Sequence, residues 1–149
     1  MLLMMLPEQV SNQWETIRPA IEASLPAGIE VTEEYMTNVL QSILRGGMQC
    51  WVLVNGVEVC AIGVTAILSD PGGCLNLFIY SLYGYKPAPL HLWSDAIDTL
   101  RKWADSKGCT EIVAYSDSDN KFVIMLAERL GGDVSRVLIR IPISKNGGL

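Results

Sequence analysis

The stretch CLNLFIYSLYGYKPAPLHLWSDAIDTLRKWADSKGCTEIVAY, residues 74–115, decides the fold class of this chain. Its first part, from Cys74 to Leu82, is too apolar for a strand with both faces in water, so a buried strand is predicted. A loop then leads into a helix that ends at Gly108. A second strand, from Thr110 to Tyr115, follows. The apolar side chains of the helix recur on one stripe, formed by Trp93, Ile97, Leu100 and Ala104.

Two amphipathic helices and a β-hairpin are predicted before this stretch. The first helix runs from about Glu8 to Ser24, and Pro19 inside it predicts a kink or two shorter helices. The second has Thr32 as its expected N-cap and stops at Gly46. Asn55-Gly56 predicts a type I′ turn in the hairpin Trp51–Cys60. That turn would place four valines on one face, Val52, Val54, Val57 and Val59.

The remaining segments complete one sheet with helices on both sides. The second hairpin strand continues to about Leu68, and a turn follows at residues 70–73. Ser118 or Asp119 is expected to cap a further helix, and the alternation from Val137 to Ile143 predicts a last strand. The predicted fold class is therefore α/β (α+β mixed), with a central mixed, mostly antiparallel sheet and helices on both faces.

Length and composition indicate a single domain over residues 1–149. Half of the residues are hydrophobic and the mean hydropathy is +0.28, so the chain can build a core and have apolar surface left for a partner. Residues 1–7 are expected to form an apolar N-terminal arm or a short strand, and residues 144–149 a frayed tail.

Charge and cysteine usage exclude several classes of function. The net charge is −5 and no basic run is longer than Arg101-Lys102, which argues against nucleic-acid binding. No apolar run is long enough to cross a membrane. We expect a cytoplasmic protein with no metal site, because its cysteines lack the spacing of a zinc or redox pair. The four are expected to be buried thiols: Cys50, Cys60, Cys74 and Cys109.

The order of these elements resembles the GNAT superfamily of N-acetyltransferases. Asn120 followed by LAERLGG, residues 126–132, is similar to the family's late helix, usually an Asn and then LYEKLGF. ADSKGC, residues 104–109, is similar to the end of its central helix. The Asn55-Gly56 hairpin matches its second and third strands. The resemblance covers Val10 to Ile143 and implies a GNAT-like sheet; the chain is also similar to small GNAT-like proteins encoded by tailed phages.

The loop before the central helix departs from the family's pattern. In the family, the pyrophosphate of acetyl-coenzyme A rests on a Gln/Arg-x-x-Gly-x-Gly/Ala loop, where backbone N–H groups and the helix dipole hold the charge. Here the basic position falls on Ala88 and the glycine positions on His91 and Trp93. Pro87 and Pro89 lack backbone N–H groups as well. We therefore expect no cofactor, with acetyl-coenzyme A as the alternative.

A second departure is Ala127, where many members of the family have a tyrosine that protonates the departing thiolate. Tyr115, Tyr80 or Ser81 are the hydroxyls that would replace it. We expect no catalytic residue. If acetyl-coenzyme A binds, the candidate contacts implied by the resemblance are Gly84, Tyr85, Lys86 and Asn120.

Each of three further features has two alternative interpretations. His91 is either a general base or a plain residue at the start of a helix. Asn120 either contacts a cofactor or is an ordinary first-turn polar residue. The tyrosines at 80, 83 and 85 either pack or form a substrate cage.

Two functions from different classes follow from these patterns. The first is a GNAT-fold protein with a degenerate acetyl-coenzyme A loop, serving as a non-catalytic binding or structural module. On this hypothesis it is phage-encoded, virion-associated and bound to a protein partner or to itself, in the host cytoplasm or the virion. The alternative is an active acetyl-coenzyme A-dependent N-acetyltransferase that acts on a small-molecule or protein amine.

Overall fold

The structure is a computed structural model that describes residues 1–116, 120–134 and 139–143. The chain divides into two compact units, Met1–Tyr115 and Ser116–Leu149, and each is described by itself. The expectation of one domain stays a prediction.

The first unit is built on a mixed sheet whose strands lie in the order of the chain, β1-β2-β3-β4-β5. The pairs β1–β2, β2–β3 and β3–β4 are antiparallel, and β4–β5 is parallel. The predicted mixed, mostly antiparallel sheet is therefore confirmed. The residue bounds are β1 Leu2–Met4, β2 Met48–Asn55, β3 Glu58–Ser69, β4 Leu75–Gly84 and β5 Cys109–Ala114.

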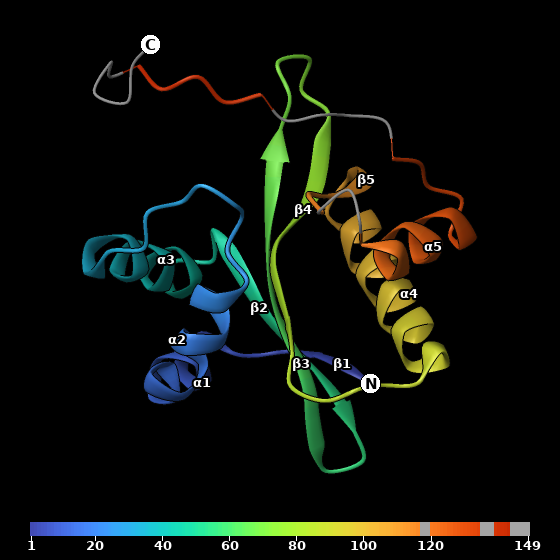
Figure 1. Cartoon of the computed structure of the whole chain (residues 1–149), viewed down its shortest axis with the longest axis horizontal. Coiled ribbons are helices and arrows are strands. Elements are labelled where there is room, and N and C mark those ends of the chain that lie inside the picture. Colours follow the sequence, from blue (N-terminus) through green and yellow to red (C-terminus); the bar gives the residue numbers. More distant parts are fainter. Residues whose placement is uncertain (117–119, 135–138, 144–149) are drawn as a thin grey trace. The chain divides into compact units, whose positions relative to one another are not determined.

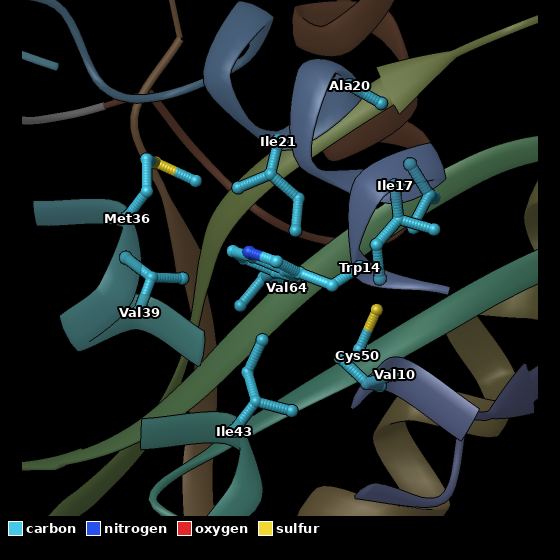
Figure 2. Packing of buried hydrophobic residues seen from close by; sticks show 11 residues of the cluster. Val10, Trp14, Ile17, Ala20, Ile21, Met36, Val39, Ile43, Cys50 and Val64 are labelled. Atoms are coloured by element: carbon cyan, nitrogen blue, oxygen red, sulfur yellow. The ribbon is translucent and has the colours of Figure 1, made fainter. Parts of the chain in front are cut away.

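One face of the sheet is covered by three helices, α1 Pro7–Asn12, α2 Trp14–Ala23 and α3 Glu33–Leu44 (Figure 1). Thr32 caps α3 as predicted, because its hydroxyl accepts a hydrogen bond from the Tyr35 N–H. Figure 2 shows apolar side chains of these helices converging on those of β2 and β3. The cluster includes Val10, Trp14, Ile17, Ile21, Met36, Val39, Ile43, Cys50 and Val64.

The first predicted helix is broken, although Pro19 does not break it. The break lies at Gln13, which is the C-cap of α1 and the N-cap of α2. Pro19 lies inside α2 and is exposed. Its ring fixes a helical φ, and the carbonyl of Glu15 that loses a donor is on an exposed residue of the first turn, where water can satisfy it.

Helix α4 (Leu90–Ser106) packs on the opposite face of the sheet (Figure 1). The C-terminal half of α4 contacts Trp51 and Leu77, and the rings of Trp51 and Trp103 meet edge to face with centroids 5.4 Å apart. The predicted stop at Gly108 is confirmed by its φ of +80°. The buried stripe is shifted from the predicted one and consists of Leu92, Ala96, Leu100 and Ala104.

The hairpin turn differs from the predicted type. Asn55 pairs with Glu58, so the central residues are Gly56 and Val57. Only Gly56 has a positive φ, +65°, which is the signature of type II′ and not of type I′. Val57 is consequently 99% exposed at the turn, and Val59 is also exposed, so the four valines do not form one buried face.

The cysteine prediction is half right. Cys50 and Cys60 are buried thiols, whereas Cys109 is half-buried and Cys74 is exposed. Cys74 precedes β4 and belongs to the turn, where its N–H donates to Asp70 Oδ1 at 2.9 Å. Burial raises the pKa of the Cys50 thiol to about 12.

In the second unit, α5 spans Lys121–Arg129 and has Asn120 as its N-cap. The Asn120 side chain accepts a hydrogen bond from the Val123 N–H at 3.2 Å. The predicted caps Ser118 and Asp119 lie outside the described residues. So do residues 135–138 and the predicted tail, residues 144–149, but residues 139–143 are described and form no strand. The predicted last strand is therefore wrong for those residues, because alternation forms a strand only where a partner strand supplies hydrogen bonds.

The N-terminal residues form a strand, as one of the two interpretations expected. Leu2 to Met4 pair with Leu53 to Trp51 at the edge of β2. Within the described ranges, no helix combines the length and the apolar composition needed to cross a membrane.

Candidate functional site

The site is built where β4 runs on after β5 has ended. The parallel pairing stops at Ile79, opposite Ala114, while β4 continues to Gly84. Within the described part of the chain, residues 80–84 have β3 on one side and no strand on the other. Backbone groups on that open side are available to a ligand with amide-like donors and acceptors.

A β-bulge lies at the point where the two strands part. Val64 of β3 pairs with Ser81 and the next residue, Thr65, pairs with Ile79, so Tyr80 is the extra residue of β4. Bulges of this kind change the direction of a strand and re-aim its side chains. The bulge therefore explains locally why β4 departs from β5.

Ser81 is a buried polar residue beside this bulge. It is 3% exposed, and its Oγ has no hydrogen-bond partner among the described residues. Gly63, which pairs with Leu82, allows the close approach of the strands, because a Cβ there would lie 3.2 Å from the Ser81 carbonyl oxygen. An unpaired buried hydroxyl is costly, and such groups in native proteins often belong to a binding site.

The loop after β4 holds three of the predicted cofactor contacts. Gly84 ends the strand, and the N–H groups of Tyr85 and Lys86 both donate to the Cys60 carbonyl, at 2.7 and 3.2 Å. The Lys86 ammonium forms an exposed ion pair with Glu58 at 3.0 Å. Burial, and then the neighbouring Tyr83, raise the pKa of the Tyr85 phenol. These contacts fix the backbone of the loop and leave the Lys86 side chain in solvent.

The start of α4 keeps open donors despite the prolines. Pro89 is the N-cap, and its carbonyl accepts from the N–H groups of Leu92 and Trp93, at 3.0 and 3.3 Å. The N–H groups of Leu90 and His91 have no partner within the described residues. A proline at the N-cap removes no donor of the first helical turn, so Pro89 leaves these two N–H groups open to an anion.

On the α3 face of the sheet, a second part of the site adjoins the bulge. We call it the α3 pocket, an open surface pocket of ≈ 300 Å³ lined by Tyr35, Asn38, Val39, Ser42, Met48 and Tyr80. The hydroxyls of Tyr35 and Tyr80 are hydrogen-bonded to each other, and burial raises the pKa of the Tyr35 phenol. The Tyr35 phenol is therefore protonated at neutral pH.

Sequence reasoning found Tyr80 and missed the α3 side of this pocket. Tyr35, Asn38 and Ser42 were not considered as site residues. Their signal was present, because positions 35, 38 and 42 share one side of a helix at three- and four-residue spacing. The other predicted tyrosines are not lining residues of this pocket: Tyr83 and Tyr85 pack edge to face on each other, with centroids 5.2 Å apart. His91 is exposed at the second position of α4.

Comparisons with known proteins identify the fold. No protein-family model and no curated protein sequence matches the chain. Among solved structures, it is similar to the aminoglycoside acetyltransferase AAC(6')-Iy in complex with the bisubstrate analogue CoA-S-monomethyl-acetylneamine, at 14% identity, 97% coverage of each chain and a TM-score of 0.71. It is likewise similar to AAC(6')-Iy in complex with CoA, at 15% identity, 97% and 95% coverage and a TM-score of 0.70.

A third structural neighbour is an aminoglycoside acetyltransferase from an uncultured soil metagenomic sample, in complex with sisomicin. It is 9% identical, with 97% and 95% coverage and a TM-score of 0.69. The expectation of no cofactor is contradicted by the first two neighbours, because chains of this fold were solved with CoA or with a CoA conjugate. The resemblance to phage proteins and the loss of activity stay predictions. The five-stranded mixed sheet with helices on both faces is the GNAT-like fold of these acetyltransferases.

Proposed function

We propose that this chain binds acetyl-coenzyme A along the open side of β4 and transfers the acetyl group to an amine. The observation that carries the proposal is the segment 80–84, which continues past the end of β5 with a bulge at its start. The buried Ser81 hydroxyl, unpaired within the described residues, lies in the same segment and supplies a donor for a carbonyl oxygen.

The residues of the site fit the chemical groups of this cofactor. Its amide-bearing arm can pair with the backbone of residues 80–84 as an added strand would. Its phosphates suit the N–H groups of Leu90 and His91 at the positive end of α4. Lys86 can turn from Glu58 towards a phosphate, because an exposed ion pair contributes little, about 0–1 kcal/mol.

The other three contacts predicted from the sequence have different places in the proposal. Gly84 and Tyr85 continue the open strand into the loop, where a ligand would contact their surface. Asn120 belongs to the second unit and caps α5 in the structure. Its contact with the cofactor remains an expectation from the family resemblance.

The cofactor supplies an acetyl group activated as a thioester. In the transfer, the C–S bond breaks and a C–N bond forms to the acceptor amine, which attacks in its neutral form after its ammonium has given a proton to water. The nitrogen then releases a second proton to water, while the thiolate takes a proton from a donor residue that water reprotonates. Ala127 has no proton to give. We assign the proton donor to Tyr80, which is at the bulge and is held by its hydrogen bond with Tyr35.

The alternative function is a non-catalytic binding module, and Ala127 is the observation that favours it. On this hypothesis the cofactor binds and no acetyl group is transferred. A protein partner or self-association, a cytoplasmic location and a phage or virion role are predictions of the same hypothesis.

Calorimetric titration with acetyl-coenzyme A tests the proposal. We expect binding in the micromolar range, and we expect Leu90→Asp to weaken it at least about tenfold by placing a carboxylate beside the phosphates. An acidic residue in the first turn is favourable for a helix, so the variant should fold. Val31→Asp is the matched control, because Val31 is a similarly exposed apolar residue before α3, on the other face.

Absence of binding at millimolar acetyl-coenzyme A refutes the proposal, and so does equal weakening by both variants. Binding without acetylation of any amine identifies the non-catalytic module instead. Mass spectrometry of the acceptor distinguishes these two results, because each acetylation adds one acetyl group.

A further inference from the structure

The α3 pocket contains no charged side chain. Its polar lining consists of the phenols of Tyr35 and Tyr80, the amide of Asn38 and the hydroxyl of Ser42, and the rest is Val39 and Met48. A pocket that selects a polycation needs several carboxylates, because each desolvated ammonium must be paired. The composition of this pocket therefore disfavours acceptors that carry many ammonium groups.

The carboxylates on the neighbouring part of α3 do not make the pocket suitable for an acceptor with many ammonium groups. Glu33 is held by Arg18, whose guanidinium donates two hydrogen bonds to it at 2.9 and 2.6 Å. Glu34 is exposed and precedes Asn38 by four residues, so it lies one turn away along the same side of the helix. A single carboxylate near the rim matches a single ammonium.

The polar groups of the pocket are available to a ligand. Within the described residues, the side chains of Asn38 and Ser42 form no hydrogen bond. The two phenols bond to each other, and each oxygen keeps further acceptor capacity. Together, these groups offer an acceptor amine both hydrogen-bond donors and hydrogen-bond acceptors without net charge.

The pocket also adjoins the place of acetyl transfer. Tyr80 lines the pocket and is at the same time the bulged residue of β4. Phe78 and Tyr115 extend an aromatic surface from it, with the Phe78 ring 6.2 Å from Tyr80 and 5.4 Å from Tyr115 between centroids. An amine seated in the pocket would have one end at the bulge and its body against aromatic rings.

We propose that the acceptor is a small primary amine with a single ammonium group and an aromatic or hydroxyl-bearing body. This inference rests on the proposed acetyl transfer. The open pocket of ≈ 300 Å³ has the volume of about ten water molecules, which suits one ring with a short amine arm. An acceptor with a single ammonium group would distinguish this chain from its structural neighbours whose complexes contain sisomicin or a neamine conjugate.

Binding of tyramine and of neamine to the full chain, each without acetyl-coenzyme A, tests this pocket separately from catalysis. We expect tyramine to bind more tightly than neamine, and Asn38→Ala to weaken tyramine binding about threefold to tenfold by removing its hydrogen bonds. Thr37→Ala is the matched control, because Thr37 is exposed on the neighbouring position of α3 and does not line the pocket. It should leave tyramine affinity unchanged.

A second variant tests the charge argument. Asn38→Asp adds a carboxylate to the pocket and should shift preference towards neamine, while acetyl-coenzyme A affinity stays as in the parent chain. Tighter binding of neamine than of tyramine by the parent chain, no binding of tyramine, or equal effects of Asn38→Ala and Thr37→Ala overturns the inference. Failure of the proposed function is distinguishable, because it appears as lost acetyl-coenzyme A binding with tyramine binding intact.

Discussion

Replacing Ser81 with alanine should make the protein more stable and its cofactor binding weaker. The Ser81 hydroxyl is buried and has no partner among the described residues. Burying an unpaired hydroxyl costs roughly 1–3 kcal/mol in protein mutational data. The small void that alanine leaves costs at most about 1 kcal/mol. We therefore expect the free energy of unfolding to rise by about 1 kcal/mol.

Urea unfolding measures this change directly. The midpoint should increase at unchanged m-value, and a chain of this size should melt about 2–4 °C higher for each 1 kcal/mol. In calorimetry, the same variant should bind acetyl-coenzyme A several-fold more weakly, because one neutral hydrogen bond is worth about 0.5–1.5 kcal/mol.

Thr65→Val is the matched control of opposite sign. The Thr65 hydroxyl accepts from Trp51 Nε1 and donates to Gln49 Oε1, both at 2.9 Å, and Thr65 is as buried as Ser81. Valine leaves the buried indole N–H without an acceptor, so we expect the free energy of unfolding to fall by about 1–3 kcal/mol. If Ser81→Ala also destabilises, its hydroxyl is hydrogen-bonded in solution and the reasoning fails. Unchanged cofactor affinity would remove Ser81 from the site.

Three further predictions concern the scaffold. In native protein, the exposed Cys74 should react first with a thiol reagent, while Cys50, whose pKa burial raises to about 12, should react only after unfolding; early labelling of Cys50 contradicts its placement. The hydrogen bonds from Arg18 lower the pKa of Glu33 from its ordinary 4.5. Their contribution to the stability of the fold is therefore present above that pH, and it is lost as the pH falls through the pKa that Glu33 has in the folded protein. The stability difference between the parent chain and Glu33→Gln should therefore shrink in acid. A difference that does not depend on pH refutes a stabilising interaction between Arg18 and Glu33. Gly56→Ala should cost about 1 kcal/mol in urea unfolding, because Gly56 has a φ of +65°, and a neutral substitution would exclude that turn.

Several elements were predictable because their signals are local. Thr32 and Gly108 mark a helix start and a helix end through hydrogen bonds and a φ value that involve only neighbouring residues. The apolar periodicity of α2 and α3 likewise anticipates the buried face of each helix. Even where the position of a break was wrong, as at Pro19, the existence of two short helices followed from the pattern.

The hairpin shows where local signals stop. Asn55-Gly56 correctly predicts a tight turn, but the register of β2 against β3, with a bulge after Leu53, makes Gly56 and Val57 the central residues. A register depends on every cross-strand pair and on which side chains the covering helices bury. For the same reason, the alternation up to Ile143 predicted a strand that residues 139–143 do not form.

By itself, the sequence determined the order of strands and helices around residues 74–115 and therefore the fold class, because periodicity, caps and turns are properties of neighbouring residues. Only the tertiary structure decided the site. The bulge at Tyr80 arises from the pairing of β3 with β4, and the pocket joins that residue to Tyr35, 45 positions earlier in the chain. The donors at Leu90 and His91 depend on where α4 begins. A loop that looked unable to hold a cofactor thus precedes a helix start whose N–H groups are open, since donors are set by backbone geometry and only partly by residue type.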